Sequence, residues 1–212
     1  MLHRRALLQS IAKSAAGLVA IQSEARAQTE RRRTVSAGVV AGLTGKASAS
    51  KRGRLPAATR LLGNGSDIFV GENIQTRASS RLHAQLGAAT HLYMGENTRL
   101  MIDRHLLRRG GTIHLATGGM MFDRKPPDPG TGVTIRSPFA LLAVRGTTFF
   151  AGPSNGVFGV FVEDGEVAVS AMGKTVTLRP GQGTDIARVG DRPTDAALWG
   201  KARIDAARAS VR

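Results

Sequence analysis

The stretch that decides the fold is Val157-Phe158-Gly159-Val160-Phe161-Val162, followed by Glu163-Asp164-Gly165-Glu166 and then by Val167-Ala168-Val169. Runs rich in valine and phenylalanine are typical of β-strands. An Asp-Gly pair between two such runs is typical of a tight hairpin turn. We therefore predict two strands here, joined by a hairpin whose tip is the acidic segment 163–166.

Outward from this stretch, residues 35–190 consist of short alternating segments separated by glycine-containing turns, a pattern typical of all-β domains. The clearest further strands are expected at Val133–Ile135, Ala140–Val144, Thr175–Leu178 and Ile186–Val189. Residues 124–132 are rich in proline and glycine and predict a loop. The sequence thus predicts a single all-β domain of stacked short strands, arranged as a sandwich or roll. A local repeat of Gly-Glu-Asn at 71–73 and 95–97 predicts two turns in which asparagine tolerates a positive φ.

The first 27 residues are typical of an export signal. Arg4-Arg5 precedes a modestly apolar stretch, and Ala25-Arg26-Ala27 supplies small residues at the two positions that a signal peptidase checks. Adjacent arginines favour the twin-arginine route over the Sec route. The alternative is an amphipathic N-terminal helix of a cytosolic protein. We expect a signal peptide at 1–27, a basic flexible linker at 28–34, and a mature protein in the periplasm of a Gram-negative bacterium.

The last segment, 191–212, predicts a short helical tail after the β-domain. Pro193-Thr194-Asp195 is a suitable helix start, and the residues from Ala196 to Ala209 are rich in alanine, arginine and leucine. We expect this helix to be docked by Leu198, Trp199 or Ile204, or else to be frayed.

Composition excludes several classes of protein. The 212 residues include no cysteine, so disulfide scaffolds, cysteine-type zinc sites and thiol nucleophiles are excluded. No apolar run is long enough to span a membrane as a helix. Thirty basic against fifteen acidic residues give a net charge of +15, and most of the surplus lies before residue 131. We expect weak contact with an anionic envelope surface rather than nucleic-acid binding, because aromatic residues for base stacking are scarce.

The central part of the chain resembles the FecR domain. The resemblance rests on Ile135-Arg136-Ser137-Pro138, on Val144-Arg145-Gly146-Thr147-Thr148-Phe149, on the stretch Val160 to Val167, and on Leu178 to Gln182. A looser similarity extends it to about residues 35–190. The resemblance implies an exported β-rich module for binding or signal transduction, linked to iron-transport signalling and to the cell envelope, with a protein partner such as a receptor or transducer.

Seven residues are expected to matter as family motif positions, for structure or for partner binding: Arg145, Gly146, Thr147, Phe149, Gly165, Glu166 and Gly181. A guanidinium can tie together carbonyl or carboxylate groups of neighbouring segments. We therefore expect Arg145 to be a buried brace of the turn at Gly146, whose loss would lower stability by a few kcal/mol. The alternative is that Arg145 grips an anionic ligand or partner.

Two other functional classes remain open. FecR-type regulators usually carry a cytoplasmic anti-sigma region and a membrane helix before this domain, and an export signal in their place argues against direct sigma-factor binding. An anti-sigma regulator of iron-uptake genes is one alternative, which requires that residues 1–27 are retained and face the cytoplasm. An envelope carbohydrate-binding or hydrolytic enzyme, using Glu163, Asp164 and Glu166, is the other. Convergence of His83, His91, His105 and His114 on a metal is possible by residue type only. We expect no catalytic, cofactor or metal site.

Overall fold

The computed structural model describes residues 35–51, 59–103, 111–124 and 132–212. The predicted export signal, including Arg4, Arg5, Ala25 and Ala27, lies outside the described residues. The same holds for the predicted linker at 28–34 and for most of the predicted loop at 124–132. The compact unit considered below runs from Ser36 to Arg212. None of the helices in the described part is long and apolar enough to cross a membrane.

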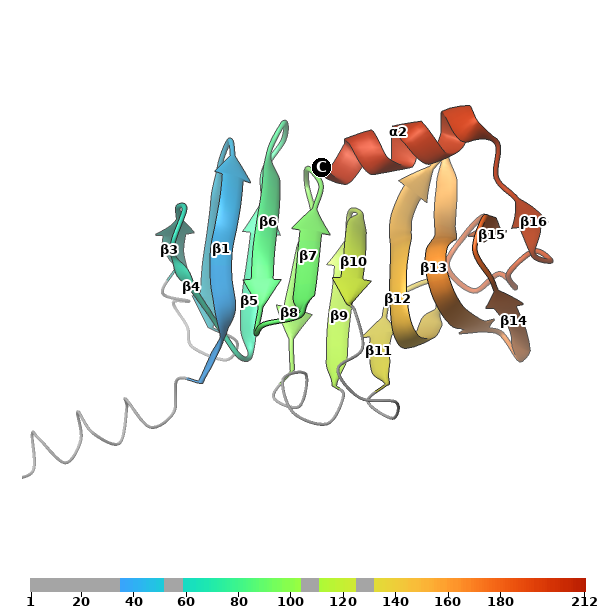
Figure 1. Cartoon of the computed structure of the whole chain (residues 1–212), viewed down its shortest axis with the longest axis horizontal. Helices are drawn as coiled ribbons and strands as arrows, with labels where there is room; N and C mark the ends of the chain where they lie inside the picture. The colour runs from blue at the N-terminus through green and yellow to red at the C-terminus, as the bar shows by residue number, and fades with distance from the viewer. Residues whose placement is uncertain (1–34, 52–58, 104–110, 125–131) are drawn as a thin grey trace, which may run out of the picture. The chain divides into compact units, whose positions relative to one another are not determined.

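Strands make up almost all of the regular structure, which confirms the all-β prediction (Figure 1). The elements in chain order are β1 (Ser36–Thr44), β2 (Ala47–Lys51), β3 (Thr59–Leu62), β4 (Asp67–Phe69), β5 (Glu72–Thr76), β6 (Arg81–Leu86), β7 (Thr90–Met94), β8 (Arg99–Ile102), β9 (Thr112–Thr117), β10 (Met120–Arg124), β11 (Val133–Arg136), β12 (Leu141–Ser154), β13 (Val157–Ala171), β14 (Lys174–Leu178), β15 (Gln182–Ile186), β16 (Ala197–Leu198) and the helix α2 (Lys201–Val211).

The sixteen described strands form one sheet that curls over on itself. Its main path runs β3-β2-β5-β8-β9-β11-β12-β10-β7-β6-β1-β4. One half of the sheet thus contains β2, β5, β8, β9 and β11, and the other contains β1, β6, β7 and β10, with β12 between them (Figure 1). All pairings on this path are antiparallel except that of β9 with β11, which is parallel. Along the chain, single strands and the hairpins β2–β3, β6–β7 and β8–β9 therefore add to the two halves alternately.

Both long strands, β12 and β13, serve both halves of the sheet. The first part of β12 pairs with β11 and its last part with β10. The first part of β13 pairs with β15 and its last part with β14. The hairpin between the two long strands turns at Asn155-Gly156, where both residues have positive φ, the geometry that a two-residue hairpin turn requires.

The hairpin predicted at residues 163–166 is therefore wrong. β13 continues through this segment, and its register with β12 shifts between Arg145 and Phe149. Gly165 does have a positive φ of 82°, but a glycine in this conformation also forms a β-bulge, which bends a strand without ending it. The Asp-Gly pair correctly indicated a backbone irregularity at this position, but the irregularity is a bulge and not a hairpin turn.

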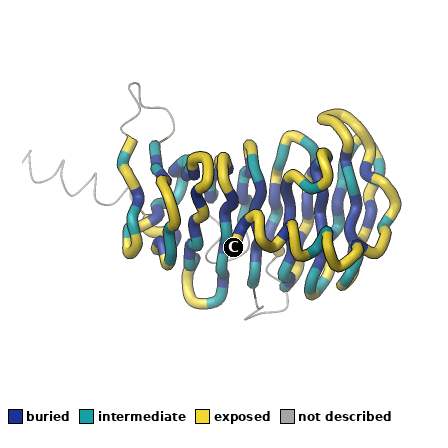
Figure 2. Tube along the Cα trace, turned by 90° about the horizontal axis from the view of Figure 1, so that it is seen from above, coloured by how far each residue is buried: buried dark blue, intermediate teal, exposed yellow. Residues whose placement is uncertain are grey.

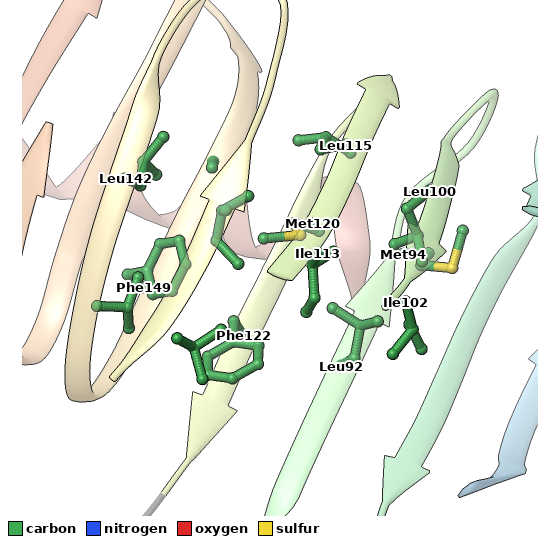
Figure 3. Close-up of a cluster of buried hydrophobic side chains, with 14 of the residues drawn as sticks. Leu92, Met94, Leu100, Ile102, Ile113, Leu115, Met120, Phe122, Leu142 and Phe149 are labelled. Carbon is green, nitrogen blue, oxygen red and sulfur yellow. The ribbon is translucent and has the colours of Figure 1, made fainter. Parts of the chain in front are cut away.

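The core fills the space between the two halves. It is built by alternate residues of nearly every strand, such as Leu92, Leu100, Ile113, Phe122 and Phe149, which are all fully or almost fully buried (Figure 3). On most strands the residues between them are half-buried or exposed (Figure 2), whereas Met121, Phe150 and Phe161 are buried on the opposite face. This alternation is the expected result when one face of each strand meets an apolar core and the other meets water.

A ladder of buried threonines ties the halves together where the chain passes between them. The Thr76 hydroxyl donates to the Gly95 carbonyl at 2.6 Å and accepts from the Thr98 amide at 3.0 Å. Thr98 repeats this arrangement with Gly119, at 3.1 Å in both directions.

The repeat of Gly-Glu-Asn differs between its copies, because Asn97 has a positive φ whereas at the first copy the positive φ belongs to Gly71. The predicted asparagine turn is correct for the second copy alone.

Helix α2 covers the outward face of the sheet half that contains β10. Met121, Phe150 and Phe161 point away from the main core and form a second apolar cluster with Trp199 and the buried residues of the helix. Of the three docking residues expected, Trp199 is buried and Ile204 packs against the cluster, whereas Leu198 is 79% exposed. The helix begins at Lys201 rather than at the predicted Ala196, because Ala197 and Leu198 form β16 beside β15.

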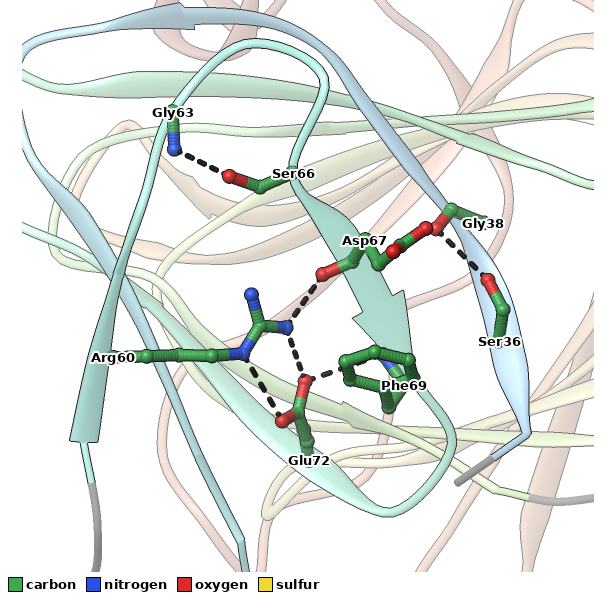
Figure 4. Close-up of polar contacts among 8 residues, drawn as sticks. All are labelled: Ser36, Gly38, Arg60, Gly63, Ser66, Asp67, Phe69 and Glu72. Carbon is green, nitrogen blue, oxygen red and sulfur yellow. Dashed lines mark hydrogen bonds and ion pairs between the residues drawn. The ribbon is translucent and has the colours of Figure 1, made fainter. Parts of the chain in front are cut away.

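On β3 and β5, an ion pair occupies core-facing positions that apolar residues occupy on most other strands. Arg60 of β3 contacts the buried Glu72 of β5 at 2.6 Å and also donates to the Asp67 carbonyl (Figure 4). The Glu72 carboxylate accepts a further bond from the Phe69 amide at 3.2 Å. A buried carboxylate is costly unless it is paired and hydrogen-bonded, and Glu72 meets both conditions.

Candidate functional site

The family motif positions lie where the paired strands β12 and β13 pass from one half of the sheet to the other. We call this region the crossing of β12 and β13. Gly146 and Gly165 have positive φ values of 56° and 82° and lie on neighbouring strands. A Cβ at Gly165 would overlap the Gly146 carbonyl oxygen and the Thr147 side chain. Both glycines are needed because the strands approach this closely while they bend from one half of the sheet to the other.

Three further motif positions support this crossing from inside. Phe149 is fully buried in the main core. The Gly181 amide donates to the Val162 carbonyl at 2.9 Å and so attaches the start of β15 to β13. Thr147 is 1% exposed, and its hydroxyl has no hydrogen-bond partner within the part of the chain that the structure describes. The motif's buried members therefore have a structural role.

Arg145 and Glu166, in contrast, face solvent. They lie opposite each other on β12 and β13, and both are exposed. Glu166 contacts Arg179 at 3.8 Å, whereas Arg145 makes no hydrogen bond or ion pair with the described residues. This exposed position contradicts the expectation that Arg145 is a buried brace, because the backbone of Gly146 and Gly165 forms the turn without it. Arg145 remains available to a partner.

An apolar pocket of about 290 Å³ opens where three turns of the chain meet. Its lining comes from the β9–β10 turn, the β11–β12 turn, the β12–β13 hairpin and the residue after β15: Leu115, Ala116, Thr117, Gly118, Ser137, Pro138, Phe139, Pro153, Gly156, Val157, Phe158 and Ala187. The volume lies near the lower end of the roughly 300–1,000 Å³ of small-molecule sites. It suits one apolar side chain or a small apolar group.

The wall of this pocket is held by Ser137, which belongs to the motif segment 135–138. Its hydroxyl accepts from the Phe139 amide at 3.2 Å and from the Ala140 amide at 3.0 Å. Phe139 then stacks on Phe158 with ring centroids 4.6 Å apart and an interplanar angle of 4°. Sequence reasoning missed the pocket. The Asn155-Gly156 pair was the available signal, since it marks the hairpin that brings Phe158 to Phe139.

Two of the four histidines considered as metal ligands meet on the outward face. His83 Nε2 lies 3.0 Å from His91 Nδ1, and the His83 ring stacks on Tyr93. Burial, together with His91 and Arg212, lowers the pKa of His83 from its usual 6.5. The described residues contain no group of three or more potential ligands for a metal ion, and His105 lies outside them.

The carboxylates proposed for the enzyme alternative do not share one cleft. Glu163 pairs with Arg208 of α2 at 2.5 Å, and this contact raises the pKa of Arg208. Asp164 is exposed on the bulge, and Glu166 pairs with Arg179 instead. Glu163 and Glu166 thus have different partners, on α2 and after β14.

The sequence model of the FecR protein family matches residues 72–168. This range begins with β5 and includes the whole crossing of β12 and β13. The chain carries a FecR domain. The matched range is narrower than the 35–190 expected, and it leaves out β1 to β4, β14 to β16 and α2. No curated protein gives a significant match to the sequence.

Two crystal structures of a protein of Parabacteroides distasonis ATCC 8503, described as a "putative anti-sigma factor", resemble this fold with a TM-score of 0.54 and 15% identity. The alignment covers 63% of this chain and 63% and 62% of those chains. At this identity the likeness shows that the FecR domain here shares a fold with these proteins. It extends over less than two thirds of their length.

Proposed function

We propose that this FecR-domain protein is a non-catalytic binding module that transmits a signal at the cell envelope through a protein partner. The observation that supports this most is the apolar pocket, because its wall includes Ser137 and Pro138 of the family motif. An exposed apolar concavity bounded by rigid turns is the type of surface that receives an anchoring side chain of a partner. Arg145, exposed on the outward face of β12, adds a charged contact outside the pocket.

The place of action in this proposal is the periplasm. The twin-arginine-like segment at 1–27 supports this location, and the FecR domain supports a link to iron-transport signalling as part of the same proposal. Cell fractionation with N-terminal sequencing tests the location. A periplasmic protein beginning near Gln28 is the expected result, and a cytoplasmic protein that retains residues 1–27 would favour the anti-sigma alternative.

The anti-sigma alternative rests on the description of the Parabacteroides distasonis structures and on the FecR domain itself. In that case the partner is a cytoplasmic sigma factor. Its test is co-purification of the full chain with the sigma factors of its own host, which the periplasmic proposal predicts to be negative.

The pocket is tested by photocrosslinking in living cells. A benzophenone amino acid at Pro138 should crosslink to a discrete polypeptide, whereas the same group at Leu61, which is 82% exposed and lies on β3, four strands from β9 along the sheet, should not. In the Ala116→Leu background, which fills the pocket without changing charge, the crosslink should disappear. Equal crosslinking from both positions, or a crosslink that persists in the filled variant, would contradict the proposal.

A further inference from the structure

A second hollow lies on strands that the apolar pocket does not use. It is a polar groove of about 270 Å³ on β2, β3, β5, β8 and the residue after β5, and it is lined by Ser48, Ser50, Thr59, Asn73, Gln75, Arg77 and Arg99. On these strands the alternate residues Ala47, Ala49, Ile74 and Leu100 point into the core. The groove is therefore on the outward face of the sheet.

The hollow exists because β2 carries serines between longer side chains. Ser50 lies between Thr59 of β3 and Asn73 of β5, while Ser48 lies between Leu61 and Gln75. Adjacent strands are about 4.8 Å apart and alternate residues about 6.6 Å apart along a strand. The short serine side chains thus leave a trough with hydroxyl and amide groups repeated on two levels.

The charge of the groove has one sign. Arg77 and Arg99 are exposed, and the seven lining residues include no carboxylate. The Arg99 guanidinium donates to the Gln75 side-chain oxygen at 3.2 Å, a neutral contact that leaves its charge uncompensated. The nearby Glu72 points to the other face and is already neutralised by Arg60. This arrangement attracts an anion.

We propose that this groove binds an acidic oligosaccharide, that is, a chain of sugars that bear carboxylates. Arginine binds carboxylates through paired, charge-assisted hydrogen bonds, which assigns Arg77 and Arg99 to the acid groups. The hydroxyls of Ser48 and Ser50 and the amides of Asn73 and Gln75 both donate and accept hydrogen bonds. Sugar hydroxyls do the same, so they match these groups on the floor of the groove.

Other anionic polymers match the groove less well. Single-stranded nucleic acid requires aromatic platforms for its bases, and the lining contains none. The side chains of an acidic peptide only accept hydrogen bonds, so its only donors toward Ser48, Ser50 and Asn73 are backbone amides, whereas every sugar hydroxyl both donates and accepts. The amide and hydroxyl side chains therefore select for a saccharide and the arginines for its acidity.

The test is calorimetric titration of the full chain with three probes: trigalacturonate, the neutral maltotriose, and a tri-glutamate peptide. We expect measurable binding of trigalacturonate in low salt, at least about tenfold weaker binding of tri-glutamate, and none of maltotriose. No binding of trigalacturonate, or equal binding of tri-glutamate, would overturn the proposal.

Variants separate the groove from the general basic charge of the protein. The double substitution Arg77→Gln with Arg99→Gln should weaken trigalacturonate binding at least about tenfold. Arg188→Gln, which removes one charge from an exposed arginine outside the groove, should change it less than about twofold. Ser48→Leu fills the trough without altering charge and should also abolish binding. Retained affinity in Ser48→Leu, with a thermal unfolding curve like that of the parent, would show that net charge alone attracts the ligand and would overturn the site.

Discussion

Trp199 lies so close to Gly159 that a Cβ added to the glycine would stand 2.8 Å from the indole. The same ring covers Gly183 of β15, where an added Cβ would overlap Nε1. The two glycines, on adjacent strands, thus leave a flat surface on which one tryptophan packs; we call this surface the tryptophan seat. The guanidinium carbon of Arg203 lies 3.6 Å from the centroid of the tryptophan ring. This seat attaches the C-terminal segment to the sheet.

Filling the seat should displace the tryptophan. We expect Gly183→Ala to lower the free energy of unfolding by about 2 kcal/mol, because the indole must move away from β15 and expose apolar surface. Gly63→Ala is the control, since nothing lies within 4 Å of a Cβ at that position. Urea denaturation monitored by the fluorescence of the single tryptophan measures both; equal midpoints for the two variants would contradict the seat.

The ion pair between Arg203 of α2 and Asp185 of β15 should contribute to the docking of the helix. Both terminal guanidinium nitrogens of Arg203 donate to the Asp185 carboxylate, at 2.9 and 2.6 Å. The Arg203 and Asp185 side chains are 18% and 30% exposed. Asp185→Asn is expected to cost about 1 kcal/mol. Lys201→Met, which breaks an exposed pair with Asp205, should change stability by less than about 0.5 kcal/mol. A double-mutant cycle with Arg203→Met checks that the loss belongs to the pair.

Substitutions at the β12–β13 crossing should separate its structural residues from its exposed ones. Gly165→Ala is expected to destabilise the protein by about 2 kcal/mol or more, because φ there is 82° and the added Cβ meets the Gly146 carbonyl. Arg145→Ala should leave the melting temperature nearly unchanged, since exposed side chains without partners usually contribute less than about 0.5 kcal/mol. Thermal unfolding followed by circular dichroism measures both. A large loss in Arg145→Ala would restore the bracing role.

Stability should decrease on acidification through His83. Its pKa in the folded protein is lowered by burial and by His91 and Arg212, so the unfolded chain binds the proton more tightly. The contribution of this group is therefore complete above its unfolded pKa of about 6.5 and is lost as the pH falls toward the lower, folded value. Asp123, which lies opposite His91 on β10, is the nearest carboxylate in the register of these strands.

His83→Gln supplies the control for this pH effect. Urea midpoints at several pH values between 5 and 8 should show a smaller pH slope in the variant than in the parent protein. A slope that stays the same in His83→Gln would assign the acid sensitivity to other groups.

The sequence predicted the strands well where alternate residues meet the core, as at Val133–Ile135 and Thr175–Leu178, which lie in β11 and β14. It failed where glycine serves long-range contacts. No strand was predicted between Leu178 and Ile186, yet β15 begins at Gln182, and its Gly183 leaves the space that Trp199 fills. Ile186 ends that strand instead of beginning the predicted one at 186–189.

The candidate pocket shows the same limit. Ser137 and Pro138 were singled out as motif residues, but their apolar neighbours come from turns that are distant in the sequence, such as Ala116 and Val157. Alternation along a strand reports which side of the sheet a residue faces. It carries no information about which turns meet at the end of a strand.

The continuity of β12 and β13 through both halves of the sheet has a consequence for how the protein unfolds. Neither half ends at the crossing, so separating them requires breaking the same hairpin that holds each one together. Opening of one half alone would leave Phe149 and its neighbours hydrated on the other. We therefore expect one cooperative transition, with the slowest hydrogen exchange of the molecule in the amides of this hairpin.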